Sequence, residues 1–139
     1  MLEAAGIVSG LAFFKGGLCS MQKKVTNPEQ RWRPLSLMPA FKFAVGRAAE
    51  GARVQAKSMR VAIKHPGLVN RFDLVRMRLV YEETALNAAM CREQVKRWRG
   101  ECVTREQMMA LDRLEGIVDQ WSDDTDEVLE AIKALLHEH

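Results

Sequence analysis

Residues 70–100 read NRFDLVRMRLVYEETALNAAMCREQVKRWRG, and this stretch decides the fold. Asn70 is a favourable N-cap residue with Asp73 three positions later, and Gly100 is typical of the position just beyond a helix. The stretch therefore predicts one uninterrupted helix from Asn70 to about Arg99. Its roughly 30 residues would extend for about 45 Å.

This predicted helix carries two apolar faces. One face has residues at helical spacing: Phe72, Val75, Leu79, Leu86 and Met90. The other alternates between spacings of four and three residues: Met77, Tyr81, Thr84, Ala88, Cys91, Val95 and Trp98. Because each apolar face needs a neighbour to cover it, we expect the long central helix of the fold here. Part of its length should project or pair with another chain.

Residues 39–64 predict an amphipathic helix that precedes the long one. Its apolar side chains recur every three or four positions: Phe41, Ala44, Val45, Ala48, Ala52, Met59, Ala62 and Ile63. Pro39 suits the first turn of this helix, and the sequence His65-Pro66-Gly67 ends it. The alanines on its buried face would let a neighbouring helix approach closely.

The chain beyond Gly100 predicts two more helices. Thr104 and Gln107 fit a capping box, which begins a helix that runs through Trp121. The polar run SDDTDE at residues 122–127 predicts a break. A last short helix then carries the apolar residues Val128, Leu129, Ile132, Leu135 and Leu136.

These elements predict an all-α protein. The sequence has no alternation of useful length for strands, and 139 residues are enough for one packed domain but few for two. We expect residues 39–139 to form an antiparallel three- to four-helix bundle with one long central helix. Residues 1–38 should form an N-terminal apolar segment and a less regular, proline-containing arm.

The N-terminal segment, residues 2–14, is apolar apart from Glu3 and Ser9. It is shorter than the ~20 apolar residues of a membrane span, and it lacks the positive start of a signal peptide. We expect it to dock on the core or on a partner. Peripheral contact with a membrane surface, supported by Lys15, Lys23 and Lys24, is an alternative.

The arm contains Arg31-Trp32-Arg33 between Pro28 and Pro34. An indole between two guanidinium groups could stack on an exposed base while the arginines bind phosphates. It could equally anchor a protein partner, or hold the arm against the helical core.

Charge is distributed unevenly along the chain. Residues 1–80 contain fourteen Lys and Arg against four Asp and Glu, a net charge of +10, whereas residues 81–139 contain seven against fourteen, a net charge of −7. The first half would attract an anionic partner, or the two halves would complement each other. In the predicted helix 39–64, five cations gather within about 60° to form a basic ridge. These are Lys42, Arg53, Lys57, Arg60 and Lys64.

No motif indicates catalysis or a bound cofactor. Cys19, Cys91 and Cys102 have no zinc spacing to one another or to the three histidines, and phosphate-binding and nucleophile-elbow motifs are absent. Asp112, Glu115 and Asp119 share a helix face, which we interpret as a solvent-facing acidic ridge or as a partner of the basic ridge. The odd number of cysteines favours a reducing compartment, so we expect a cytoplasmic protein without a disulfide scaffold.

The sequence thus favours a non-enzymatic helical protein-interaction module, such as an adaptor, a chaperone-like factor or a regulator, that self-associates as a homodimer. Its expected partner-binding residues are Phe72, Val75, Leu79, Leu86, Met90 and Trp98. A second hypothesis is a sequence-tolerant nucleic-acid-binding protein that uses the basic ridge and the arm. Its expected residues are Arg31, Trp32, Arg33, Lys42, Arg53, Lys57, Arg60 and Lys64. A peripheral membrane protein is the third.

Overall fold

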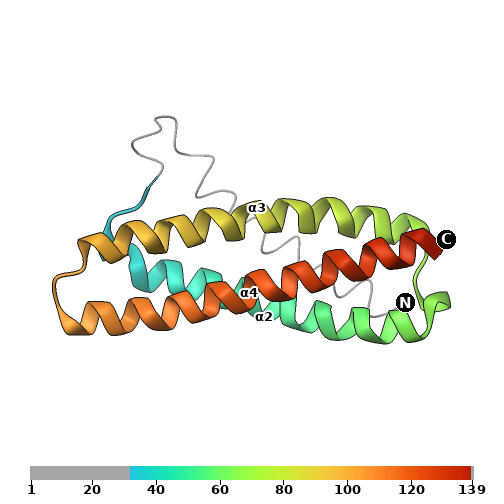
Figure 1. Ribbon diagram of the computed structural model, residues 1–139, viewed down its shortest axis with the longest axis horizontal. Coiled ribbons are helices and arrows are strands. Elements are labelled where there is room, and N and C mark those ends of the chain that lie inside the picture. The colour runs from blue at the N-terminus through green and yellow to red at the C-terminus, as the bar shows by residue number, and fades with distance from the viewer. Residues whose placement is uncertain (1–31, 139) are drawn as a thin grey trace.

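The computed structural model describes residues 32–138, and every regular element in this range is helical (Figure 1). The three long helices are α2 (Met38–Lys64), α3 (Arg71–Glu101) and α4 (Arg105–Glu138). Two short 3-10 turns, η2 (Leu35–Leu37) and η3 (Pro66–Leu68), precede α2 and α3. The all-α prediction is confirmed. The apolar segment at residues 2–14 and Arg31 lie outside the described residues.

The local signals at the starts of α3 and α4 act as expected. The Asn70 side-chain oxygen accepts a 2.8 Å hydrogen bond from the backbone N–H of Asp73. At the start of α4, the backbone N–H of Gln107 donates to the Thr104 hydroxyl at 3.1 Å, and the Gln107 side-chain oxygen accepts from the Thr104 N–H at 3.0 Å. These reciprocal bonds make up the predicted capping box.

One packing rule applies to all three helices. In each, the residues that form the inward seam alternate between spacings of three and four. The seam of α2 is Met38, Phe41, Val45, Ala48, Ala52, Gln55, Met59 and Ala62. That of α3 is Leu74, Met77, Tyr81, Thr84, Ala88, Cys91, Val95 and Trp98. That of α4 is Leu111, Leu114, Val118, Trp121, Thr125, Val128, Ile132 and Leu135. A repeat of 3.5 residues is the pattern of helices that wind around one another as in a coiled coil.

Helix α4 is continuous where the sequence predicted a break at residues 122–127. The run is polar, but it contains neither proline nor glycine, and Thr125 takes the seam position between Trp121 and Val128 with no exposed surface. The run therefore keeps the four- and three-residue spacing of the seam, although its side chains are polar. The predicted fourth helix is therefore the second half of α4, and three helices pack against each other.

The predicted central position of residues 70–100 is also corrected. Helix α3 is uninterrupted from Arg71 to Glu101, as the sequence predicted. It includes Gly100, which the sequence placed just beyond the helix. However, α4 is the longest helix and packs along both α2 and α3. The apolar face that carries Phe72, Leu79 and Leu86 points away from the core, and no helix of the described residues covers it.

Contacts near the helix ends fix which parts lie side by side. The rings of Phe41, early in α2, and Trp98, late in α3, meet edge to face with centroids 5.1 Å apart. Arg99 of α3 contacts Asp112, early in α4. Accordingly, the α2–α3 connection lies at the same end of the molecule as the C-terminus, and the α3–α4 connection lies at the other end (Figure 1).

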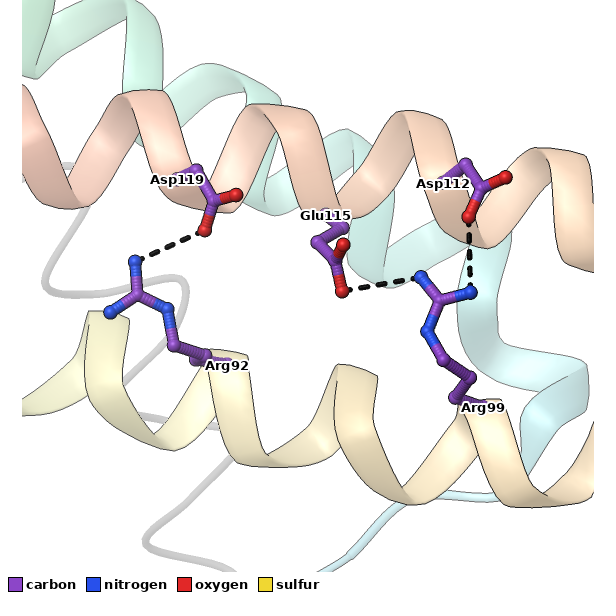
Figure 2. A network of polar contacts seen from close by, with 5 residues as sticks. All are labelled: Arg92, Arg99, Asp112, Glu115 and Asp119. Carbon is purple, nitrogen blue, oxygen red and sulfur yellow. Dashed lines mark hydrogen bonds and ion pairs between the residues drawn. The ribbon is translucent and has the colours of Figure 1, made fainter.

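Arginines of α3 and carboxylates of α4 form a polar staple between the two helices (Figure 2). The Arg99 guanidinium forks between Asp112 at 3.0 Å and Glu115 at 3.2 Å. Arg92 contacts Asp119 at 3.1 Å, about two turns away. The acidic ridge predicted from the sequence is thus neutralised by α3 and not by the basic ridge on α2.

Candidate interaction surface

The most exposed apolar side chains of α3 form a row on its outward side. Phe72 is 70% exposed, Leu79 62% and Leu86 68%. They are seven residues apart, so they lie almost directly above one another along about 21 Å of helix. At 100° per residue, this row lies about 170° from the seam that faces the core. We call Phe72, Leu79 and Leu86 the α3 strip.

Half-buried and charged residues border the α3 strip. Val75 and Met90, which the sequence placed on the same face, are half-buried at its edge. The guanidinium carbon of Arg76 lies 5.7 Å from the centroid of the Phe72 ring. Arg78 and Glu82 form an exposed pair at 3.7 Å within the helix. The strip is therefore an apolar row with charges of both signs beside it, which is the composition of many protein interfaces.

Trp98 does not belong to this surface, although the sequence grouped it with the partner-binding residues. It is fully buried at the end of the α3 seam, and its indole N–H donates a 2.9 Å hydrogen bond to the Arg33 carbonyl oxygen. The spacing of Trp98 places it on the inward face, so a periodicity count over the helix would have excluded it.

The described part of the arm is held against the end of α3. The Gln94 side chain bonds both backbone groups of Arg33: its oxygen accepts from the N–H at 2.8 Å, and its nitrogen donates to the carbonyl at 3.3 Å. The Arg97 guanidinium carbon lies 4.3 Å from the centroid of the Trp32 ring. Of the roles considered for the arm, the structure shows Trp32 and Arg33 packed on the helical core.

The basic ridge of α2 is only partly available. Arg53, Lys57 and Lys64 are exposed and Lys42 is half-buried. Arg60 contacts Glu127 of α4 at 2.8 Å, and this hydrogen bond and the charge of Glu127 raise its pKa. The structure thus brings three exposed cations together on the outward side of α2.

The outward side of α2 also exposes apolar side chains that the sequence analysis missed or misplaced. Phe43, Val54 and Val61 are exposed, and Ile63, which was assigned to the buried face, is 48% exposed. Charged residues interrupt this row, including Arg47, whose guanidinium carbon lies 5.9 Å from the Phe43 ring centroid. The row is less continuous than the α3 strip.

A polar layer crosses the middle of the core, and the sequence analysis did not recognise it. The Gln55 amide, the Tyr81 hydroxyl, the Thr125 hydroxyl and one Asp124 oxygen are buried without a hydrogen-bond partner among the described residues. Burial raises the pKa of Tyr81, and the nearby charge of Asp124 raises it further. Because α2 and α4 begin at the same end and Arg60 meets Glu127, Gln55 lies within about one turn of the level of Thr125.

The cysteine on the inward face of α3 is held in an unreactive form. Cys91 is buried in the α3 seam, and burial raises the pKa of its thiol to about 12. A thiol held in its neutral form is a poor nucleophile and a poor metal ligand. Cys102 is half-buried at the end of α3. Within residues 32–138, no group of three or more His, Cys, Asp or Glu residues could hold a metal ion.

None of the helices in the described part of the chain is sufficiently long and apolar to cross a membrane. Comparison of the chain with models of protein families, with curated proteins and with solved structures finds no match.

Proposed function

We propose that this chain is a non-enzymatic helical protein-interaction module, an antiparallel three-helix bundle that binds a protein partner and associates with itself through the α3 strip. An adaptor, a chaperone-like factor or a regulator would use a rigid helix face in this way. The free thiols at Cys91 and Cys102 support action in the reducing cytoplasm.

One observation carries the proposal. Phe72, Leu79 and Leu86 expose about two thirds of their surface in a single row, on a helix whose opposite face is completely buried. Large apolar side chains that are aligned on one face, with charges at the edge, are typical of docking surfaces. A single exposed leucine would carry no such meaning.

The test is the oligomeric state and the binding capacity of two matched variants. Leu79→Glu places a charge in the α3 strip, and Val54→Glu places the same charge at a 51% exposed position on α2. Light scattering after size-exclusion chromatography should show self-association of the wild type and of Val54→Glu but not of Leu79→Glu. Proteins that co-purify from the native host should be lost in the same pattern. Equal behaviour of the two variants in both assays would refute the proposal.

A second candidate function is sequence-tolerant binding of nucleic acid by α2. Its support is the row of Arg53, Lys57 and Lys64, which are exposed and have no acidic partner among the described residues. Fluorescence anisotropy with mixed-sequence DNA and RNA at about 50 mM salt measures it, because phosphate contacts weaken steeply as salt rises. Binding that survives reversal of all three charges would contradict this role.

Peripheral membrane association would depend on residues 2–14, which lie outside the described residues. Flotation with liposomes, before and after deletion of residues 1–24, tests it directly.

A further inference from the structure

The α3 strip matches a second copy of itself that runs in the opposite direction. Leu79 is central, with Phe72 seven residues before it and Leu86 seven residues after it. Arg76 lies three residues before Leu79, and Glu83 lies four residues after it. When the helix is read backwards from Leu79, apolar residues again meet apolar residues, and Arg76 falls within one residue of the level of Glu83.

We propose that the α3 strip binds the same strip of a second copy of this chain, with the two α3 helices antiparallel and the twofold axis passing beside Leu79. The proposal rests on the proposed function and specifies its partner. In this arrangement Leu79 faces Leu79 of the second copy, and Phe72 faces Leu86 of the second copy. Each apolar side chain of the strip then has an apolar neighbour.

The charges agree with this direction and not with the parallel one. Arg76 and Glu83 lie on the same side of the strip, within about 20° of each other around the helix. A twofold axis perpendicular to both helices keeps that side together, so Arg76 of each copy lies beside Glu83 of the other. In a parallel pair the twofold axis runs along the helices, so Arg76 and Glu83 of one copy lie on the opposite side of the interface from those of the other and cannot pair.

The outward position of the strip makes this contact accessible. The three strip residues lie opposite the seam that packs on the rest of the bundle, so two copies can approach without separating any described helix. The side of α3 that carries the Arg92 and Arg99 staple to α4 is distinct from the strip. A symmetric contact of this kind also closes on itself and does not propagate into a fibre.

Cysteine cross-linking tests the direction of pairing. In a background with Cys19→Ser and Cys102→Ser, mild oxidation should convert Leu79→Cys into a covalent dimer. Phe72→Cys and Leu86→Cys should each remain monomeric under denaturing conditions, because identical residues away from the axis are about 21 Å apart. A mixture of these two variants should give a covalent heterodimer. Self-linking of Phe72→Cys would show a parallel pair, which overturns the inference and leaves the proposed function intact.

Charge exchange tests the specific contact. Arg76→Glu and Glu83→Arg should each weaken self-association by about tenfold or more in sedimentation experiments at low salt. An equimolar mixture of the two should recover the wild-type affinity as a heterodimer, since every contact again joins opposite charges. Arg53→Glu on α2 is the matched control and should have no effect. Failure of the mixture to recover affinity would overturn the assignment of this pair.

Other occupants of the strip would give different results. A chain that is monomeric at about 100 µM but dimerises after deletion of residues 1–24 would show that its own N-terminal segment covers the strip. A chain that is monomeric in both forms, yet loses a co-purifying protein on Leu79→Glu, would show a different protein as the partner. Both results overturn the second-copy assignment, and the latter preserves the proposed function.

Discussion

The inward and outward faces of α3 have the same sequence period but opposite surroundings. Leu74, Tyr81 and Ala88 repeat every seven residues and are buried against the other helices. Phe72, Leu79 and Leu86 also repeat every seven residues and remain exposed. Period alone therefore shows that a face is apolar and aligned, but it does not show whether the same chain or another chain covers it.

The largest expected difference between the two faces concerns stability. Trp98→Ala removes a fully buried ring from the inward face together with its hydrogen bond to Arg33, and should lower the free energy of unfolding by about 3–5 kcal/mol. Leu86→Ala on the outward face should change it by less than about 0.5 kcal/mol in the dilute monomer. Urea denaturation at low protein concentration measures both.

Concentration separates the two faces further. The effect of Leu86→Ala should grow as protein concentration rises, because a self-associating protein gains stability from its dimer. The loss of stability caused by Trp98→Ala should not depend on protein concentration. If Trp98→Ala fails to fold, the milder Trp98→Phe still keeps the comparison measurable. A Leu86→Ala effect that is large at every concentration would mean that the outward face is covered within the chain.

Much of the inward face could be predicted from the sequence because its rules are local. Asn70 and Thr104 mark helix starts through hydrogen bonds within one turn, and the stop at His65 depends on the adjacent proline. The break predicted before Val128 was wrong because composition was weighed above spacing. Thr125 is polar, but it keeps the seam interval and is small enough to be buried.

The outward face could be predicted only in part, because exposure depends on which helix lies opposite. Residues 72, 79 and 86 were recognised as one face, yet nothing local shows that α4 covers the other face and leaves this one bare. Trp98 was assigned to the partner surface, although its register places it on the inward face. The acidic ridge found its partners on α3, which depends on the order in which the helices pack.

The polar layer places polar side chains within an otherwise apolar core. Replacing them with apolar side chains should stabilise the bundle. Gln55→Leu together with Thr125→Val exchanges buried polar groups without partners for apolar groups of similar size. We expect the free energy of unfolding to rise by about 1–3 kcal/mol, measured by urea denaturation. The control Lys133→Leu changes an exposed residue of α4 away from the layer and should have little effect. A destabilised double variant would show that the layer is satisfied in solution.

Alkaline pH should lower the free energy of unfolding through two groups on the inward face of α3. Burial raises the pKa of Cys91 to about 12 and raises that of Tyr81, so both groups are neutral in the folded protein at a pH where they ionise in the unfolded chain. The stability that these neutral buried groups contribute is complete below the ordinary thiol pKa near 9, and it is lost as pH rises towards 12. We expect the free energy of unfolding to fall by about 1–2 kcal/mol between pH 8 and pH 10.

Thiol labelling gives an independent measure of the same burial. In a Cys19→Ser background, a thiol reagent at pH 8 should modify Cys102 readily and Cys91 only on unfolding. Cys91→Ala should flatten the alkaline decline in stability. Rapid labelling of Cys91 in the native protein would contradict its place in the seam.

The smallest expected effect belongs to the polar staple, which lies at the boundary between the two faces. Arg99 forks between Asp112 and Glu115, and these hydrogen bonds raise its pKa, but the acidic partners are largely exposed. Exposed ion pairs are screened by water and salt, so Arg99→Ala should lower the Tm by no more than about 3 °C at low salt. The difference should vanish at about 1 M salt, where the Debye length is near 3 Å. Arg113→Ala, on α4 outside the staple, is the control. A salt-independent loss for Arg99→Ala would mean that its aliphatic stem, packed where α3 meets α4, stabilises the bundle more than its charge does.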